Sequence, residues 1–486
     1  MEFFPSMAVF LKIGSIEIRW YAVCILTGAL LAYYLSDREA KKDKYDSGVL
    51  DDIFIGCMFF GILGARLWYC LFYNWSGYIS NPISIIEIWD GGLAIQGGII
   101  AGILFAIIYC KIEHYQFCHL ADIVMPNVLL AQACGRWGNF FNQEAYGNVV
   151  KESYFDGILS FLKQGMYINY EYRQPMFFYE SVLCLVGFIL IKIYRKSANA
   201  KRGSGLFAYL AWYGAIRFWI ETQRSDSLML GNLKMAMIVS VVFMLIGIPG
   251  LLGVFNKLIN REKPVIIFDL DGTLLDTQPA IFASFKHTFE IYRPELQLTD
   301  EDYASFLGPT LKQSFQKYCP DASAEQIDEM VATYKEHNNK VHKDLVKAMP
   351  NVKELLDWLK ENGYKVAIAS SKVSKTIELG LEVSGLTDYF QTIVGVEQVY
   401  NPKPDKEILI KTLKELKAPF TNAVYVGDSA SDIECAKNAG VYSVGFTSNK
   451  LKIDDLKASE PNELIDDMGQ LKVVLSKDHS WSFNLK

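Results

Sequence analysis

The sequence predicts a multi-domain protein: a seven-helix transmembrane α bundle followed by a soluble, doubly wound α/β domain that carries a helical cap. Two observations carry this prediction. The first half contains seven long apolar runs, whereas short β-branched runs alternate with polar amphipathic segments from Pro264 onward. With 486 residues the chain is long enough for both parts. We place the membrane domain at residues 1–258, the soluble domain at 263–486 and the cap at about 278–349.

The membrane domain is predicted from run length, because a helix needs about 17–25 mostly apolar residues to cross a bilayer. The fourth and sixth runs are shorter and carry polar groups. No basic segment and no small-residue cleavage site surround the first run, which favours a retained span over a removable signal peptide. The runs are Ile18–Leu35, Ile53–Tyr73, Leu93–Cys110, Leu120–Cys134, Phe177–Tyr194, Gly205–Ile220 and Met235–Leu252.

Loop charges predict the orientation, since cytoplasmic loops carry an excess of Lys and Arg. Basic residues gather after the first run (residues 38–44), after the fifth (192–202) and after the last (257–263), whereas Asn74–Asp90 contains none. We therefore expect the N-terminus outside, residues 136–176 facing outward and the soluble domain in the cytoplasm.

Composition excludes some classes of partner. Residues 1–262 hold 22 Lys and Arg against 20 Asp and Glu, and residues 263–486 hold 26 against 34, so neither half has the basic surface that nucleic-acid binding requires. The nine cysteines are mostly scattered through apolar runs without metal-ligand spacing, which predicts small buried side chains.

Charged side chains inside a membrane run are costly and usually line a site. In the sixth run Tyr213, Arg217, Glu221 and Arg224 fall within an arc of about 80° on one helix face. A guanidinium group can donate two parallel hydrogen bonds to anionic oxygens, so this stripe predicts a phosphate site. An interhelical salt-bridge network is the alternative that spacing leaves open.

A second polar cluster follows the fourth run. Arg136, Asn139, Asn142 and Glu144 lie close together in GRWGNFFNQEAYG (residues 135–147), whose glycines allow tight backbone approach. An amide-rich interfacial turn is the simpler interpretation, but so dense a stretch favours a site.

This stretch resembles a signature of the prolipoprotein diacylglyceryl transferase family. Four more segments resemble that family in the same order: WYAV (20–23), GGLAIQGG (91–98), RQPMFFYES (173–181) and YGAIRFWIETQR (213–224). The resemblance covers nearly all of residues 1–255. It implies transfer of the diacylglyceryl group from phosphatidylglycerol to the lipobox cysteine thiol of a prolipoprotein, with no cofactor.

The resemblance also implies residue roles. Arg136 and Arg217 match phosphate-binding arginines. Other functional positions are matched by Asn139, Glu144, Gly147, Glu221, Tyr21, Tyr213 and Arg224. One position departs, because many members carry His where this chain has Gln96, and an amide cannot act as a base near neutral pH. The group that deprotonates the thiol is therefore unassigned, with Tyr21 and Glu144 as alternatives.

In the soluble half, buried strands are predicted at Val265–Phe268, Lys365–Ala369, Thr392–Gly395, Ala423–Val426 and Tyr442–Phe446. Polar groups follow three of them: Asp269 and Asp271 the first, Ser370 the second, Asp428 and Asp432 the fourth. Lys403 lies in NPKP (401–404). Ligand sites of such Rossmann-like sheets lie at the carboxyl ends of strands, and this set suits Mg²⁺ with a phosphoryl group.

The set resembles the haloacid dehalogenase superfamily over about residues 263–474. The resemblance implies Asp269 as nucleophile, forming an aspartyl-phosphate, and Asp271 as general acid and base. It also implies phosphate binding by Ser370 and Lys403. Mg²⁺ would be held by Asp269, Asp428 and the Asp271 carbonyl, with Asp432 supporting the metal site. The second acid favours a phosphatase, close to phosphoglycolate phosphatases and pyrophosphatases, that acts on a small phosphorylated metabolite.

The alternative for the whole chain is a membrane-anchored phosphatase or pyrophosphatase. Its spans would then bind or carry anionic lipid or phosphate without transferase activity. Transporters tend to show two related halves, and the sequence shows no such repeat.

Overall fold

The computed structural model describes residues 2–476 apart from short gaps at residues 4–5, 14–15, 73–74, 76–77, 79–80, 88–91, 198–199, 225–228, 231–232, 260–262, 307–309 and 449–452. The chain forms two compact units, Met1–Arg261 and Glu262–His479.

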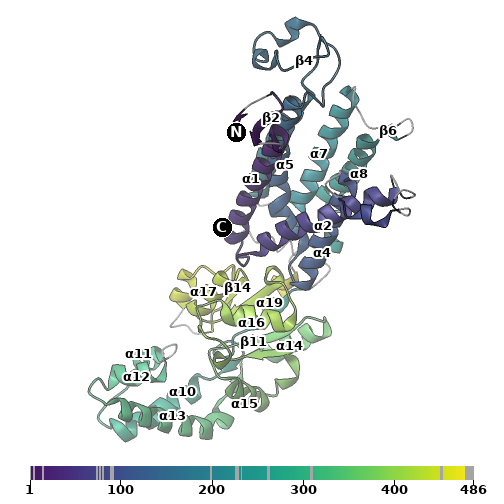
Figure 1. The fold of residues 1–486 in the computed structure, drawn as a ribbon. Coiled ribbons are helices and arrows are strands. Elements are labelled where there is room, and N and C mark those ends of the chain that lie inside the picture. Colours follow the sequence, from purple (N-terminus) through teal and green to yellow (C-terminus); the bar gives the residue numbers. More distant parts are fainter. Residues whose placement is uncertain are drawn as a thin grey trace. The chain divides into compact units, whose positions relative to one another are not determined.

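Helices dominate the first unit, and each of the seven predicted apolar runs is helical (Figure 1). They are α1 (Trp20–Lys42), α2 (Val49–Phe72), α4 (Ile95–Ile112), α5 (Phe117–Phe141), α6 (Met176–Arg195), α7 (Ser204–Gln223) and α8 (Met235–Leu251), followed by the short α9 (Asn256–Ile259). Five of the described helices, α1, α2, α4, α5 and α6, are long and apolar enough to cross a membrane. Large apolar side chains such as Ile55 (65% exposed) and Leu245 (67%) point outward, as expected for helices that face lipid.

Glycines let α2 and α4 approach closely. A Cβ atom at Gly64 would lie 2.6 Å from the Gly97 carbonyl oxygen, and one at Gly97 would lie 2.2 Å from the Gly64 carbonyl oxygen. In a bilayer the hydrophobic effect does not drive helices together. Small residues at a crossing stabilise the pair because they let the two backbones pack closely. Gly97, which belongs to the segment 91–98, therefore has a packing role in addition to any role in a site.

A carboxylate on α5 caps the start of α7. Asp122 is buried and accepts hydrogen bonds from the N–H groups of Gly203 (2.6 Å) and Leu206 (3.0 Å). The first N–H groups of a helix have no intrahelical partner and carry partial positive charge, so a carboxylate there stabilises the helix. This contact fastens α5 to α7 at one end.

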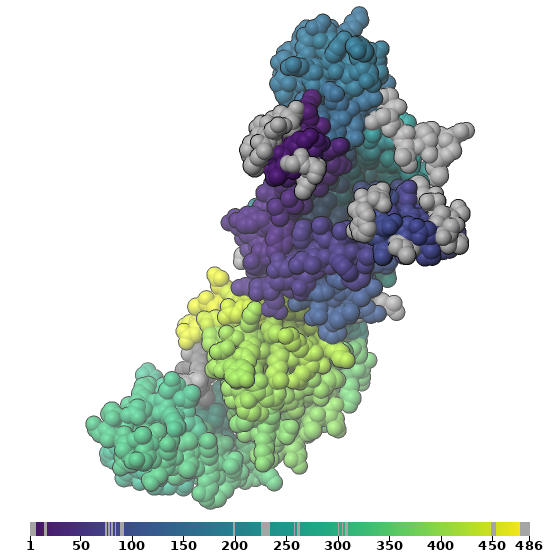
Figure 2. Space-filling view, viewed as in Figure 1, coloured from purple at the N-terminus to yellow at the C-terminus, as the bar shows by residue number. Residues whose placement is uncertain are grey.

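Three small antiparallel sheets join the helices: β1 (Glu2–Phe3), β2 (Val9–Ile13) and β3 (Ile16–Arg19); β4 (Tyr167–Ile168) and β5 (Glu171–Tyr172); β6 (Met229–Leu230) and β7 (Leu233–Lys234). The connection between α5 and α6 has a core of its own, built on Phe155, Leu162, Met166 and Phe177. Figure 2 shows this connection as a rounded projection at one end of the unit.

The second unit is built on a six-stranded parallel sheet in the order β12-β11-β8-β13-β14-β15. The strands are β8 (Val265–Phe268), β11 (Val366–Ala369), β12 (Thr392–Val394), β13 (Ala423–Gly427), β14 (Tyr442–Phe446) and β15 (Glu463–Ile465). All five predicted strands are present, and β15 was not predicted. Every residue of β8, β11 and β13 is buried, as expected for central strands covered by helices on both faces.

Helices surround the sheet and also form a separate cluster inside this unit. Between and after the strands lie α14 (Val352–Glu361), α15 (Ser374–Ser384), α16 (Glu407–Leu416), α17 (Ala430–Ala439), α18 (Ile453–Ala458) and α19 (Gln470–Ser476). The cluster comprises α10 (Gln278–Tyr292), α11 (Asp300–Ser305), α12 (Leu311–Tyr318) and α13 (Ala324–Leu345), which are grouped together in Figure 1. It is inserted between β9 (Leu275–Asp276) and β10 (Lys347–Ala348), which pair antiparallel. The four helices share an aromatic core around Phe285, Phe289, Phe306 and Phe315.

We expect Phe285→Ala to destabilise this helical cluster. Phe285 is 1% exposed and its ring lies 4.0 Å from that of Phe306, so truncation leaves a cavity that costs about 3–5 kcal/mol. Pulse proteolysis of the full chain in detergent across a urea series would measure the loss as earlier cleavage within residues 278–349. Ile291→Ala, on the same helix but 54% exposed, should leave the midpoint nearly unchanged. Equal midpoints for both variants would contradict this packing.

Candidate active sites

The first unit brings two arginines from different helices to one carboxylate. Glu180 on α6 is 1% exposed; its Oε1 lies 2.9 Å from Arg136 on α5, and its Oε2 lies 3.3 Å from Arg217 on α7. The Tyr213 hydroxyl accepts a hydrogen bond from Arg136 (3.2 Å) and donates to Glu180 (3.4 Å). We call Arg136, Glu180, Tyr213 and Arg217 the arginine cluster.

The stripe on α7 continues this cluster. Glu221 Oε2 lies 3.0 Å from Arg217 and 3.9 Å from Arg224, so the predicted stripe does occupy one helix face. The Lys234 ammonium donates to the carbonyl oxygens of Glu221 (2.6 Å) and Arg224 (2.7 Å). A cation at the end of a helix satisfies carbonyls that have no intrahelical partner. Lys234 therefore fixes the end of α7 that carries Arg224.

The turn after α5 is joined to the cluster by amides. The Asn139 amide donates to Glu144 (2.9 Å), and Arg136 reaches the Asn139 oxygen at 3.5 Å. Tyr21 on α1 packs against this region, because a Cβ atom at Gly138 would lie 2.7 Å from the Tyr21 ring.

Two more positions were selected from the sequence, Gly147 and Gln96. Gly147 donates its N–H to the carbonyl oxygen of Gln174 (3.0 Å), which ties the turn to the start of α6. Gln96 is half-buried in the first turn of α4.

Glu180 is the residue that sequence reasoning missed. It lies in the segment RQPMFFYES (173–181), near the start of an apolar run, so the rule used for α7 could have selected it. Spacing along one helix could not have found its partners, because Arg136 and Arg217 belong to two other helices.

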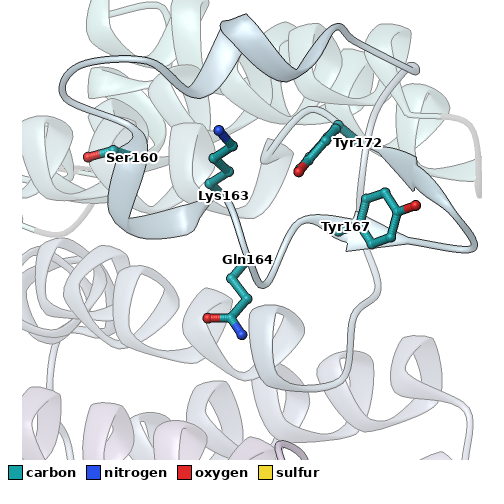
Figure 3. A pocket seen from close by; sticks show the side chains of 5 residues that line it. All are labelled: Ser160, Lys163, Gln164, Tyr167 and Tyr172. Carbon is teal, nitrogen blue, oxygen red and sulfur yellow. The ribbon is translucent and has the colours of Figure 1, made fainter.

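A hollow of about 420 Å³ lies apart from these residues, in the connection between α5 and α6. Ser160, Lys163, Gln164, Tyr167 and Tyr172 line it, as Figure 3 shows. Lys163 is paired with Glu152 at 2.8 Å, which lowers the pKa of that carboxyl and offsets the one charge in the hollow.

In the second unit the predicted polar residues meet at one edge of the sheet. The strands β11, β8 and β13 are neighbours, and Phe268 pairs with Ile368 on one side and with Val426 on the other. Their carboxyl ends are therefore level, and the residues that follow them converge where parallel sheets hold ligands.

Two carboxylates share one ammonium at this edge. The Lys403 Nζ lies 2.7 Å from Asp269 and 2.8 Å from Asp432, and all three side chains are nearly buried. Burial raises the pKa of Asp269 to about 6, although Lys403 opposes the rise. Burial also acts on Asp432, but there Lys403, Ser429 and Tyr425 outweigh it and lower the pKa. Lys403 itself has a raised pKa, because the two carboxylates outweigh its burial.

Three carboxylates here suit a divalent cation. Oxygen atoms of Asp269, Asp428 and Asp432 lie within 4.8 Å of one another, and hard cations prefer such ligands. This donor set therefore fits Mg²⁺. The backbone beside it is tightly packed: residue 272 must be glycine, since its φ is +72° and a Cβ atom would lie 2.3 Å from Asp428 Oδ2.

The remaining predicted residues border this cluster. Asp271 is partly exposed and pairs with Lys372 at 2.7 Å. Ser370, directly after β11, is 1% exposed and its Oγ accepts a hydrogen bond from the N–H of Lys372 (3.4 Å). The edge thus offers a buried carboxylate, a second acid beside it, and a hydroxyl with an ammonium that can bind phosphate oxygens.

The geometry shows two kinds of polar site on one chain: arginines that share a buried carboxylate in an apolar helical unit, and a carboxylate-lined edge of a parallel sheet. The family profile described as prolipoprotein diacylglyceryl transferase matches residues 8–252, half of the chain, and the one described as haloacid dehalogenase-like hydrolase matches residues 266–446. The chain therefore belongs to the prolipoprotein diacylglyceryl transferase family and carries a haloacid dehalogenase-like domain after it.

Curated relatives match the first unit. A phosphatidylglycerol–prolipoprotein diacylglyceryl transferase of Streptococcus equi subsp. zooepidemicus is 44% identical over 238 residues, which are 49% of this chain and 91% of that protein. One of Lactococcus lactis subsp. cremoris is 44% identical over 252 residues, 50% of this chain and 94% of that protein. Among solved structures, one from Bacteroides fragilis named as a haloacid dehalogenase-like hydrolase is 29% identical and covers 43% of this chain and 100% of its own, with a TM-score of 0.40.

We expect Glu180→Ala to destabilise the first unit. The substitution leaves two guanidinium groups without their shared carboxylate, and breaking such a buried pair costs about 3–5 kcal/mol. The thermal midpoint of the purified protein in detergent, followed by circular dichroism, should fall. Glu171→Ala is the matched control, since Glu171 is 47% exposed in its pair with Arg173 and should cost less than about 1 kcal/mol. If the Glu180 variant melted with the wild type, the carboxylate would not be holding the helices together.

Proposed function

We propose that residues 1–258 transfer the diacylglyceryl group from phosphatidylglycerol to the lipobox cysteine of a prolipoprotein. The observation that supports this proposal is that Arg136 and Arg217, from two different helices, both pair with the carboxylate of Glu180. Their side chains remain 22% and 17% exposed, so a phosphodiester can reach both. Each guanidinium can donate two parallel hydrogen bonds to phosphate oxygens, which positions the anion.

The proposed reaction needs an anion hole and a proton acceptor. The thiol sulfur forms a bond to a glycerol carbon, the bond from that carbon to the phosphate oxygen breaks, and glycerol phosphate leaves with the electron pair. Arg136 and Arg217 stabilise the charge that develops on this leaving group. Tyr213, Arg224 and Gly147 contribute to substrate binding in this scheme, and Asn139, Glu221, Glu144 and Tyr21 to catalysis. The thiol proton passes to Tyr21 or Glu144, because Gln96 has no basic group.

The proposed location is the bacterial cytoplasmic membrane, with seven spans, the N-terminus outside and residues 263–486 in the cytoplasm. The distribution of Lys and Arg among the loops supports this orientation. Glycerol phosphate from the transferase would then be released outside, on the opposite side from the second unit. Direct transfer of that product between the two sites is therefore not part of the proposal.

We infer that residues 263–486 form a phosphatase for a small phosphate ester, with residues 278–349 as a cap over the site. Asp269 attacks the phosphorus and forms an aspartyl-phosphate, and Asp271 protonates the leaving oxygen and later activates water. Ser370 and Lys403 bind the phosphate oxygens. Mg²⁺ held by Asp269, Asp428 and the Asp271 carbonyl, with Asp432 in support, would neutralise phosphate charge.

Arg217→Ala should lower transferase activity by about 100-fold or more, the usual effect of removing one preorganised donor from an anion site. The assay is formation of a thioether-linked diacylglyceryl adduct on a lipobox peptide in phosphatidylglycerol vesicles. The activity of Arg217→Lys, which keeps the charge but loses the two parallel hydrogen bonds, should lie between that of the wild type and that of Arg217→Ala. Arg195→Ala should keep activity, since Arg195 pairs with Glu39 (3.1 Å) at the opposite end of α6. A wild-type protein that forms no adduct would instead favour an anchor or carrier of anionic lipid.

Asp269→Asn should abolish Mg²⁺-dependent phosphate release, because an amide cannot serve as the nucleophile. A screen of small phosphate esters and pyrophosphate with the full chain would measure this, and EDTA should abolish the wild-type signal. Lipidation of the peptide by the same variant should be unchanged, which controls for folding of the first unit. Phosphate release that persists in Asp269→Asn would exclude this mechanism.

A further inference from the structure

The connection between α5 and α6 contains a short extended segment at the edge of a small sheet. Residues 147–150, which we call the edge segment, run antiparallel to the end of β5. The N–H of Val150 donates to the carbonyl oxygen of Tyr172 (2.9 Å), and the N–H of Gln174 donates to that of Asn148 (3.0 Å). On its other side β5 pairs with β4, so the edge segment is an outer strand.

The backbone polar groups of Val149 face away from β5. Val149 lies opposite Arg173, between the two hydrogen bonds just described, in a pair that exchanges no hydrogen bond of its own. The N–H and C=O of a residue in such a pair point to the far side of its strand. Neither group has a hydrogen-bond partner in the part of the chain that the structure describes, and Val149 is 51% exposed.

An open strand edge pairs readily with another chain, so proteins usually protect such edges with Lys, Pro or a covering element. At this edge the exposed residue is the apolar Val149. An extended peptide can add to an open edge through backbone hydrogen bonds, which do not depend on the side chains of the peptide. The edge segment therefore suits an extended peptide as its ligand.

The edge segment follows the arginine cluster closely along the chain. Glu144 accepts a hydrogen bond from Asn139, which Arg136 reaches, and Val149 comes five residues after Glu144. Five residues span at most about 18 Å. An extended peptide advances about 3.4 Å per residue, so roughly five or six of its residues cover that distance. A peptide whose thiol lies at Glu144 can therefore reach Val149.

We propose that the edge segment binds the prolipoprotein by β-strand addition, with one of the roughly six residues after the lipobox cysteine paired to Val149. This rests on the proposed transferase function. The C=O of that peptide residue accepts from the N–H of Val149, and its own N–H donates to the C=O of Val149. The pairing falls after the cysteine because the apolar part of a signal sequence precedes it and stays among the membrane helices. It holds the thiol near Arg136 in precursors of different sequence.

The first test is Val149→Pro, which removes the outward N–H and is compatible with an edge strand. The full chain in mixed micelles of detergent and phosphatidylglycerol is assayed for the diacylglyceryl adduct of a lipobox peptide. KM for the peptide should rise about fivefold, the effect of one lost hydrogen bond, whereas kcat and KM for phosphatidylglycerol should not change.

Ile158→Pro is the matched control in the same connection. Ile158 is 89% exposed, and its N–H has no partner among the described residues. It is the second residue of a turn closed by the N–H of Ser160 and the carbonyl oxygen of Gly157 (3.1 Å), a position that favours Pro. This variant should leave all three kinetic values unchanged.

A peptide scan tests the same pairing without a change in the enzyme. Each peptide carries one backbone N-methyl group, placed in turn on the second to sixth residue after the cysteine. One position should raise KM about fivefold, and its two neighbours, whose N–H groups point the other way, should not. At that position the methyl group should cost less in Val149→Pro than in the wild type, because both changes act on one pair.

Unchanged peptide KM values in both tests, with a wild type that lipidates the peptide, would overturn the proposal. A lower kcat or a higher KM for phosphatidylglycerol in Val149→Pro would do the same, as would equal losses at every methylated position. If Val149→Pro altered only the oligomeric state, the edge would pair two copies of the chain, which also contradicts the proposal. If Val149→Pro did not fold, the scan with the wild type would decide. A wild type that lipidated no peptide would refute the transferase function itself.

Discussion

Neutralising guanidinium charge among apolar helices is the constraint on which the first unit depends. An unpaired ion in such a medium costs several kcal/mol even after relaxation. Glu180 lowers that cost for two ions, because its two oxygens face Arg136 on α5 and Arg217 on α7, and Glu221 also pairs with Arg217. The Glu180 carboxylate therefore joins three helices.

In the second unit it is negative charge that has to be neutralised. There one ammonium, that of Lys403, is shared by Asp269 and Asp432, with Asp428 close by. Positive charge exceeds negative charge among the membrane side chains of the arginine cluster, which suits an anionic lipid headgroup. Negative charge exceeds positive charge at the sheet edge, which suits a metal cation. Each unit thus carries an excess of one charge at its cluster, which suits a ligand of the opposite charge.

Sequence patterns predicted what depends on neighbours along the chain. Val265–Phe268 was predicted with the bounds that β8 has, because a continuous apolar run marks a buried strand. Tyr442–Phe446 was also predicted with the bounds of β14, although it contains Ser443 and Gly445. The three-residue β15 carries Glu463 and pairs at the sheet edge, so no apolar run marked it. Helical spacing predicted the stripe of Arg217 and Glu221, but contacts between helices, such as those of Glu180 and Lys234, required the tertiary structure.

The Asp122 contact determines which parts of the helical unit can separate. Asp122 ties α5 to the first turn of α7, and Arg136 meets Tyr213 fourteen residues further along α5. These two helices are fastened at two points, so the spacing between Arg136 and Arg217 is rigid. In contrast, α2 and α4 pack chiefly against each other. The α2–α4 pair can therefore shift with the loss of fewer contacts than the α5–α7 pair, which carries Arg136 and Arg217.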